Sequence, residues 1–369
     1  MKKKICFFCG VISRSGGTER VGTMIANELS NRGYDVSILS FWNDCKPFFK
    51  VNENIKIDYL LDYKEGKLYR TYIYPILKLR NYIKSKNIDI LIDIDTLLSK
   101  YSGYAVKGTK CKLVSWEHFN YYYMLKDSNR IKAKKIVNKI AEKLVVLTKE
   151  DKEAHIQNMG FDYDKIEQIY NPSPFKLKRE YNFENKNFVA VGRLTEQKGF
   201  DLLIQAWKIF ENYNKEWILT IVGDGEDREK LKELSKGVNN IKFIGKTNNV
   251  EMYYKQASCY VLSSRNEGFP MVILEAQSFG LPVIAFDCKT GPKEMVFNNK
   301  NGYLVENGNV EKLAEAMIKF ANEKEKANEM SKKSIEYVSS LSIKNIGDQW
   351  ENMINRLLFI GGRNESTKD

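Results

Sequence analysis

Short apolar runs rich in β-branched residues alternate with longer amphipathic stretches along the whole chain. This alternation is typical of a parallel sheet whose strands are joined by covering helices. In the first half, the pattern predicts a helix over 21–32 and strands over 4–12, 35–41, 55–61, 88–93, 112–115 and 143–147. We therefore expect a doubly wound α/β domain there.

The pattern stops at a cluster of prolines and charges and then starts again. Asn171, Pro172, Ser173 and Pro174 precede the polar stretch 176–186, a composition typical of a domain boundary. Beyond it, the pattern predicts strands over 188–192, 217–222, 241–244, 259–262, 282–286 and 302–304, and helices over 199–212, 228–236, 249–256, 272–279 and 310–322. We expect two doubly wound α/β domains, over 1–180 and 181–342, with a cleft between them.

The last part of the chain follows after the second domain has enough elements to close. Its stretch 343–358 is amphipathic, and we expect a helix over 343–360 that packs back toward the N-terminal domain. Residues 361–369 are polar and are expected to form a disordered tail.

The charge of the chain differs between its two halves. The 369 residues include 59 Lys and Arg and 47 Asp and Glu, a net charge of +12. Residues 1–180 hold 33 basic and 21 acidic residues, whereas 181–369 hold 26 of each. The whole excess lies in the first half, which predicts an anionic partner for that domain.

The six scattered cysteines indicate a reducing compartment, because a chain of this size needs no disulfide framework. Cys6 and Cys9 form a C-x-x-C, but they lie in the apolar run 5–12, which predicts a buried strand and not a zinc or redox site. That run follows three lysines as in a signal peptide, yet it is only about 8 residues long and lacks a cleavage site. No run approaches the roughly 20 apolar residues that cross a bilayer, so we expect no membrane span.

A glycine pair lies between the first predicted strand and its helix. Gly16 and Gly17 let an anion approach the backbone, and the start of the helix supplies free N–H groups. The spacing is not G-x-G-x-x-G, so it does not favour a dinucleotide. Phosphate binding and a tight turn both remain open for this pair.

Two cations lie on the loop after the first strand of the second domain, at an edge where open α/β sheets bind ligands. Arg193 and Lys198 are five residues apart and precede a helix. They can clamp a diphosphate, the guanidinium as a fork and the ammonium as a point charge. The alternative is a solvated loop.

Two glutamates provide the strongest signal. Glu267 stands just before a predicted helix, and Glu275 lies two turns into it among apolar residues. A carboxylate in an apolar face is costly unless it meets a hydrogen-bonding partner, and sugar hydroxyls are such partners. A helix cap together with a buried ion pair is the alternative.

Taken together, these motifs resemble those of the retaining GT-B glycosyltransferases of family 4. The resemblance covers nearly the whole chain in the expected order and rests on Gly16-Gly17-Thr18-Glu19-Arg20, Val191-Gly192-Arg193 with Lys198, Gly223-Asp224-Gly225, and Glu267 with Glu275. It implies the GT-B fold, in which two Rossmann-like domains face each other across a cleft. The N-terminal domain would bind the acceptor and the C-terminal domain the nucleotide sugar.

The resemblance also implies roles for individual residues. Arg193 and Lys198 would neutralise the leaving diphosphate in place of a metal ion, Glu267 would hold hydroxyls of the donor sugar, and His118 would lie near that sugar. The donor would be bound by Gly16, Gly17, Gly192, Gly223, Lys246, Thr247, Gly268, Phe269, Met271 and Glu275, the last through the ribose hydroxyls. Neither a metal nor another cofactor is implied.

Four polar residues have alternative interpretations. Asp93 and Asp95 have the spacing of a metal-binding Asp-x-Asp, but their place at a strand end argues against a metal. For His118, an ordinary cleft-lining role is the alternative to catalysis. His155 falls in the polar stretch 150–158 and is expected to be an ordinary surface residue.

The resemblance suggests a partner for the basic half. Two stretches, 69–86 and 118–143, combine tyrosines with cations: Tyr72, Tyr74, Lys78, Arg80, Tyr82, Lys84 and Lys86 in the first, and Tyr121, Tyr122, Tyr123, Lys126, Arg130, Lys132, Lys134, Lys135 and Lys139 in the second. We expect them to dock on anionic lipid. Solvated, lysine-rich helices are the alternative.

The sequence thus predicts a cytoplasmic enzyme at the inner face of the cell membrane. It would be a retaining, metal-independent glycosyltransferase that moves a hexose or N-acetylhexosamine from a UDP-sugar to a glycan, such as a lipid-linked precursor of capsule or another bacterial surface polysaccharide. No pair of carboxylates suited to act as nucleophile and acid is evident, which fits front-face retention. The alternatives are a sugar-nucleotide epimerase or phosphorylase of the same fold, and a basic nucleic-acid-binding protein, which would leave Glu267 and Glu275 unexplained.

Overall fold

A computed structural model describes residues 2–43, 46–62, 72–125, 127–178 and 181–360. The chain forms two compact units, which are described separately. Unit 1 comprises the chain up to Pro172 together with the chain from Ile343 on, and unit 2 spans Ser173–Ser342. The chain thus leaves unit 1 eight residues before the boundary expected from composition.

Unit 1 is built on a seven-stranded parallel sheet in the order β3-β2-β1-β4-β5-β6-β7. The strands are β1 (Lys4–Cys9), β2 (Asp35–Asn43), β3 (Lys56–Asp62), β4 (Ile90–Ile94), β5 (Lys112–Trp116), β6 (Lys143–Val146) and β7 (Ile166–Gln168). The central strands are buried on both faces, which explains their continuous apolar runs. Six strands confirm the sequence prediction, and β7 is too short to produce a pattern.

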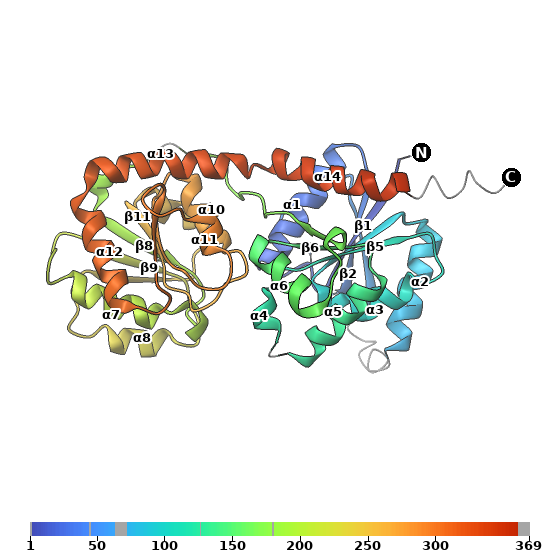
Figure 1. Cartoon of the computed structure of the whole chain (residues 1–369), viewed down its shortest axis with the longest axis horizontal. Coiled ribbons are helices and arrows are strands. Elements are labelled where there is room, and N and C mark those ends of the chain that lie inside the picture. The colour runs from blue at the N-terminus through green and yellow to red at the C-terminus, as the bar shows by residue number, and fades with distance from the viewer. Residues whose placement is uncertain (1, 44–45, 63–71, 126, 179–180, 361–369) are drawn as a thin grey trace. The chain divides into compact units, whose positions relative to one another are not determined.

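Helices cover both faces of this sheet (Figure 1). They are α1 (Gly17–Asn31), α2 (Ile73–Lys86), α3 (Ser99–Ala105), α4 (Tyr121–Met124), α5 (Ser128–Ile140), α6 (Lys149–Met159) and α14 (Ile343–Ile360). Helix α14 packs on α1, where Arg32 donates at 2.7 Å to both Asp348 and Glu351. The Trp350 ring of α14 also lies 4.6 Å from the Trp116 ring at the end of β5.

Unit 2 repeats the architecture with six parallel strands in the order β10-β9-β8-β11-β12-β13. The strands are β8 (Asn187–Val191), β9 (Ile218–Val222), β10 (Ile241–Gly245), β11 (Cys259–Leu262), β12 (Val283–Phe286) and β13 (Gly302–Val305). The helices are α7 (Phe200–Phe210), α8 (Arg228–Leu234), α9 (Val250–Lys255), α10 (Met271–Ser278), α11 (Pro292–Met295), α12 (Val310–Asn322) and α13 (Lys324–Ser340). Helix α7 packs on α12, and α10 packs on α13 (Figure 1).

Helix α13 is absent from the sequence prediction. Its buried face consists largely of small or weakly apolar residues, among them Ala327, Ser331 and Ser334. The buried serines weaken the apolar pattern of this face, although small side chains allow close packing against α10. Packing within unit 2, rather than an apolar stripe, therefore stabilises this helix.

The strand order creates one switch point in each sheet, where neighbouring connections leave in opposite directions. In unit 1 it lies at β1, between β2 and β4, and in unit 2 at β8, between β9 and β11. Open α/β sheets bind ligands at the carboxyl ends of the strands beside such a point. We therefore expect ligand sites at the loops that follow β1, β8 and β11.

Two further expectations concern the whole chain. Cys6 and Cys9 are buried in β1, as the sequence predicts. None of the helices in the described ranges combines the length and the apolar character required to cross a bilayer. The tail 361–369 and Cys45 lie outside the described residues.

Candidate active site

The carboxyl edge of the unit 2 sheet brings a lysine and a glutamate together at the switch point. Lys198 follows β8 and Glu267 follows β11, and the Lys198 Nζ donates to Glu267 Oε1 at 2.6 Å. The Glu267 side chain is 8% exposed and the Lys198 side chain 22% exposed. Ser264 donates to the same Oε1 atom at 2.6 Å, so two donors fix the orientation of this carboxylate.

Close backbone contacts hold the loops around this pair. Gly223 has φ +138°, and a Cβ there would lie 1.9 Å from the Gly192 carbonyl oxygen. Gly199 has φ +63°, and a Cβ would lie 2.0 Å from the Ser263 carbonyl oxygen. Glycine is thus required where the loops after β8, β9 and β11 approach one another.

A second ion pair joins the same loops. Arg265 makes two hydrogen bonds to Asp201 at the start of α7, of 2.8 and 2.7 Å, and donates to the Glu196 carbonyl at 2.7 Å. This pair lowers the pKa of Asp201, chiefly through the hydrogen bond from Arg265. The sequence does not reveal this pairing of Arg265 with Asp201, because partners 64 residues apart leave no local signal.

Glu275 lies on the buried side of α10 and is 8% exposed. Its Oε2 accepts a hydrogen bond of 2.9 Å from the hydroxyl of Tyr254, which is fully buried on α9. A polar partner for this carboxylate was expected, but a tyrosine of the chain itself was not. The pattern 250–255 does not reveal Tyr254, since a tyrosine on a helix is usually read as core.

The start of α10 lies directly after Glu267. Gly268 and Phe269 lead into Pro270, which precedes the first helical residue, Met271, and provides no side-chain cap. The backbone at Gly268 is fixed by Thr290, whose hydroxyl donates to the Gly268 carbonyl at 2.9 Å. This helix start points its backbone dipole toward the same edge as Lys198.

The remaining predicted residues of unit 2 are more exposed. Arg193 and Lys246 both have exposed side chains. Lys246 and Thr247 follow β10, and the Thr247 hydroxyl accepts the Asn249 N–H at 3.0 Å. The predicted positions on the loops after β8, β9, β10 and β11 therefore all lie along one edge of one sheet, and Glu275 lies on the helix that follows the last of these loops.

In unit 1, the glycine pair starts α1. Gly16 caps the helix without a side-chain hydrogen bond, and Gly17 is its first residue. A Cβ on Gly16 would lie 2.5 Å from the Glu19 carboxylate, whose pKa is raised by burial. Gly16 and Gly17 thus lie where an anion can meet helix N–H groups. The Glu19 carboxyl lies close to them, and its raised pKa favours the neutral form.

His118 follows β5, and its ring centroid lies 4.5 Å from that of Trp116. Its Nε2 atom is buried and has no hydrogen-bond partner among the described residues. Burial lowers the pKa of His118 to about 4, although Glu117 opposes this effect. A buried ring nitrogen without a partner is costly, so this atom is suited to meet a ligand.

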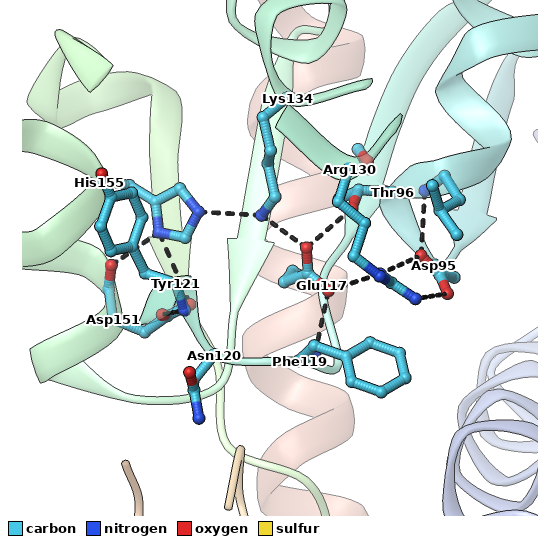
Figure 2. Close-up of polar contacts among 12 residues, drawn as sticks. Asp95, Thr96, Glu117, Phe119, Asn120, Tyr121, Arg130, Lys134, Asp151 and His155 are labelled. Atoms are coloured by element: carbon cyan, nitrogen blue, oxygen red, sulfur yellow. Dashed lines mark hydrogen bonds and ion pairs between the residues drawn. The ribbon is translucent and has the colours of Figure 1, made fainter. Parts of the chain in front are cut away.

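His155, the other histidine, does not lie where the sequence predicts. His155 is fully buried, not on the surface, and its Nε2 lies 2.9 Å from the Lys134 ammonium (Figure 2). The polar pattern around it misleads because α6 buries its charged residue Asp151 as well. A contact to a residue of α5 could not be inferred from α6 alone.

Asp93 and Asp95 make separate contacts. Asp93 is fully buried and accepts hydrogen bonds from Ser99 and Ser102, whereas Asp95 pairs with Arg130 through two hydrogen bonds of 3.0 Å. Within the described ranges, no group of three or more His, Cys, Asp or Glu residues is arranged to hold a metal ion.

We predict that neither histidine titrates in the physiological range. Burial lowers the pKa to about 4 for His118 and to about 3 for His155, so both rings should stay neutral from pH 5 to 8. NMR spectra of the ring Cε1–H groups across this range would show two unshifted signals, assigned with His118→Gln and His155→Gln. A midpoint near 6.5 for either ring would contradict the burial described.

We also predict that Gly223→Ala destabilises unit 2. Its Cβ would collide with the Gly192 carbonyl, and alanine rarely adopts φ +138°, so the free energy of unfolding should fall by at least about 2 kcal/mol. Gly192→Ala is the matched control, because its Cβ would meet its nearest atoms at 3.5 Å, an ordinary contact. Urea unfolding measures both variants, and equal midpoints would show that the loops are not tightly apposed.

Comparison with known proteins identifies the family. The model of "Glycosyltransferase Family 4" matches residues 15–173, and that of "Glycosyl transferases group 1" matches residues 175–337. An uncharacterised glycosyltransferase of Haemophilus influenzae is 35% identical over 356 residues, which cover 95% of this chain and all of the relative. The chain belongs to glycosyltransferase family 4.

Two other relatives of this glycosyltransferase have more specific names. The amylovoran biosynthesis glycosyltransferase AmsD of Erwinia amylovora is 32% identical and covers 82% of this chain and 86% of its own length. A Campylobacter jejuni N-acetylgalactosaminyltransferase, whose name includes a glycan linked to diphosphoundecaprenol, is 26% identical. The match covers 95% of this chain and 98% of the relative. Membership of the family makes the chain an enzyme and disfavours the alternative of a nucleic-acid-binding protein.

Solved structures show the same fold. The lipopolysaccharide outer core galactosyltransferase WaaB matches with a TM-score of 0.77 at 23% identity, over 96% of this chain and 99% of WaaB. HepE of Anabaena in complex with UDP matches with a TM-score of 0.76 at 18% identity, over 96% of this chain and all of HepE. The glycosyltransferase therefore has the two-domain, Rossmann-like GT-B fold, as predicted.

Proposed function

We propose that this glycosyltransferase is a retaining, metal-independent hexosyltransferase. It transfers a hexose or an N-acetylhexosamine from a UDP-sugar to a glycan acceptor. The observation that carries the proposal is the Lys198–Glu267 pair of 2.6 Å at the switch point of unit 2, beside the start of α10. A cation, a carboxylate and a helix start together provide groups for a diphosphate and for sugar hydroxyls.

Lys198 would act on the leaving diphosphate. Its ammonium has donors beyond the one used by Glu267, and it would donate to a phosphate oxygen as negative charge develops there. The exposed guanidinium of Arg193 would meet the same diphosphate from the loop after β8. In this proposal, Lys198 and Arg193 together supply the positive charge that stabilises the leaving diphosphate.

The carboxylates would bind the sugars of the donor. Glu267 already accepts two hydrogen bonds on Oε1, from Lys198 and Ser264, which reduces its nucleophilicity. Its oriented carboxylate would accept donor-sugar hydroxyls. Glu275 would accept the ribose hydroxyls. The N–H groups of Gly268, Phe269 and Met271 would meet donor oxygens, and the base would lie at Lys246 and Thr247.

Transfer with retention needs no protein nucleophile in this proposal. The bond between the sugar C1 and the diphosphate oxygen breaks, and the acceptor oxygen attacks C1 from the same face. The acceptor proton passes to the departing phosphate oxygen, so the products are the glycosylated acceptor and UDP. The neutral His118 would lie near the transferred sugar and hydrogen-bond to it through Nε2. The contributions of Gly16 and Gly17 from unit 1 stay a prediction.

The acceptor is proposed to be a lipid-linked precursor of a bacterial surface polysaccharide, such as capsule. The names of the Erwinia and Campylobacter relatives support this class of acceptor. The cytoplasmic location that the proposal includes rests on the six scattered cysteines, which a chain of this size does not need for a disulfide framework.

Unit 1 carries a surface suited to an anionic membrane. Tyr72, Ile73 and Leu77 at the start of α2 are 50%, 69% and 52% exposed. Lys100 lies over the Tyr72 ring at 5.0 Å, and Lys107 lies over the Tyr104 ring of α3 at 5.0 Å. Exposed apolar side chains beside cations favour an interface with anionic lipid.

The second stretch contributes less than the sequence suggested. Arg130 and Lys134 of α5 are buried in ion pairs, so they cannot contact lipid. Lys132, Lys135 and Lys139 remain exposed. Residues 69–71 and Lys126 lie outside the described residues.

We predict binding to vesicles of phosphatidylglycerol that weakens as salt rises, and none to phosphatidylcholine. Lys78→Glu/Lys100→Glu should reduce this binding at least tenfold, while Lys215→Glu, at an exposed site in unit 2, should not. Sedimentation across a salt series measures all three. Equal binding to both kinds of vesicle would contradict a role for the charge.

A panel of nucleotide sugars tests the proposed activity. The true donor should raise the melting temperature and be hydrolysed slowly in EDTA without an acceptor, and NMR of the released sugar should first show the anomeric configuration of the donor. Release of the inverted anomer, or strict dependence on a divalent metal, would contradict the proposed mechanism.

A further inference from the structure

A fully buried ammonium lies behind the turn that carries His118. Lys134 on α5 is 0% exposed, and its Nζ lies 2.6 Å from Glu117 Oε2 and 2.9 Å from His155 Nε2 (Figure 2). Lysine is almost never fully buried unless it is paired. Buried ion pairs add little net stability, so a pair of this kind calls for another explanation.

The geometry determines the protonation of the His155 ring. Its Nδ1 lies 2.7 Å from the carbonyl oxygen of Asp151, which can only accept a hydrogen bond. The proton is therefore on Nδ1, and the Nε2 lone pair accepts from the Lys134 ammonium. Burial and the charge of Lys134 lower the pKa of His155, so the ring is neutral.

Two buried carboxyl groups hold the turn between Glu117 and Tyr121. Glu117 Oε1 accepts the Phe119 N–H at 2.9 Å, and Asp151 Oδ1 accepts the Tyr121 N–H at 2.6 Å. Lys134 lies between the Glu117 carboxylate and the His155 ring, which is itself bonded to Asp151 (Figure 2). The path of the backbone just after His118 thus depends on Asp151 of α6 and on Glu117, which Lys134 of α5 holds.

The Glu117 carboxylate is bound from several elements at once. Oε2 accepts from Lys134 of α5 and, at 2.7 Å, from the hydroxyl of Thr96, which follows β4. Although burial alone would raise it, the charges of Lys134 and Arg130 hold the pKa of Glu117 below its usual value. Glu117 is therefore ionised and can accept from all these donors.

Arg130 supports the outer side of the same turn. Its guanidinium lies 4.0 Å from the centroid of the Phe119 ring while it pairs with Asp95. Asp95 has φ +106°, a conformation that costs energy in a residue other than glycine and persists where its surroundings fix it. The turn is thus held by its backbone N–H groups and by one side chain.

We propose that the buried Lys134–Glu117 pair positions His118. The pair fixes the backbone turn 117–121 so that the unpartnered Nε2 of His118 faces the sugar that is being transferred. Lys134 and Glu117 are then positioning residues that touch no substrate. This inference rests on the proposed function, because it takes the sugar as the partner of His118.

The test compares kcat and KM for the donor in a set of variants. Lys134→Met removes the charge but keeps the length of the side chain, and kcat should fall about 10–100-fold while KM and the affinity for UDP change less than threefold. Lys134→Met/Glu117→Gln keeps an amide oxygen to accept the Phe119 N–H without a buried lone charge, and it should recover at least a third of the wild-type kcat. Lys215→Met, at an exposed position in unit 2, should match the wild type.

Thr96→Val provides a milder variant in case Lys134→Met does not fold. It removes only the hydroxyl donor to Glu117, and kcat should fall about threefold to tenfold at unchanged KM. A wild-type kcat in folded Lys134→Met or in Thr96→Val, or a loss shared equally by kcat and UDP affinity, would overturn the inference. If His118→Ala lowers kcat and these variants do not, only this inference fails; if the wild type releases sugar from no donor, the proposed function fails.

Discussion

Lys198→Ala should lower kcat about 10²–10³-fold while the protein remains folded. The substitution removes the ammonium that would stabilise the leaving diphosphate, and loss of one preorganised charge stabiliser typically costs this much. Glu267 keeps its hydrogen bond from Ser264, so the free energy of unfolding should fall by only about 1–3 kcal/mol. Donor hydrolysis and urea unfolding measure the two effects.

The matched control for this variant is Lys215→Ala, which removes an exposed lysine from the same unit. It should retain wild-type kcat, which separates the local role of Lys198 from the net charge of the protein. Activity within threefold of the wild type in Lys198→Ala would remove this lysine from the reaction.

Glu275→Ala should weaken UDP binding by about 10–100-fold. The carboxylate would accept charge-assisted hydrogen bonds from the ribose hydroxyls, each worth roughly 1.5–3 kcal/mol. The substitution also leaves the buried Tyr254 hydroxyl without its acceptor, so some stability is lost as well. Isothermal titration of UDP and urea unfolding measure the two effects separately.

Tyr254→Phe distinguishes these effects. It removes the hydroxyl that donates to Glu275 but leaves the carboxylate in place, so UDP affinity should stay within about threefold of the wild type. If Tyr254→Phe weakened UDP binding as much as Glu275→Ala, the loss would come from the packing of α9 against α10 and not from contact with the ribose.

The fold could be predicted because its strands and helices each give a characteristic pattern of apolar residues in the sequence. Strands such as β1 and β8 are buried on both faces, and they read as continuous apolar runs between amphipathic helices. The loops of the candidate site were predictable for the same reason, since the strand ends locate Gly192, Lys198, Gly223 and Glu267 at one edge. The signal failed at α13, where buried serines weaken the apolar pattern.

The contacts that orient polar side chains were not predictable in this way. His155 and Lys134 lie in sequences that look solvated, yet each is buried because the other supplies its partner across two helices. Tyr254 meets Glu275 across 21 residues of sequence, and Arg265 meets Asp201 across 64. Such pairs satisfy desolvated groups in three dimensions, so neither member reveals the other along the chain.

The cations of the first half are not all available to an anionic partner, although composition suggests that they are. Arg130 and Lys134 serve buried pairs, whereas Lys100 and Lys107 lie over the exposed rings of Tyr72 and Tyr104. Counting cations therefore overestimates the charge that unit 1 offers to a membrane.

Hydrogen–deuterium exchange with and without UDP locates the donor site without relying on turnover. We predict that UDP slows backbone exchange in unit 2 within residues 192–199, 245–247 and 264–275. Unchanged exchange in all three segments, at a UDP concentration that saturates the protein, would contradict the assignment of the donor site to this edge of the sheet.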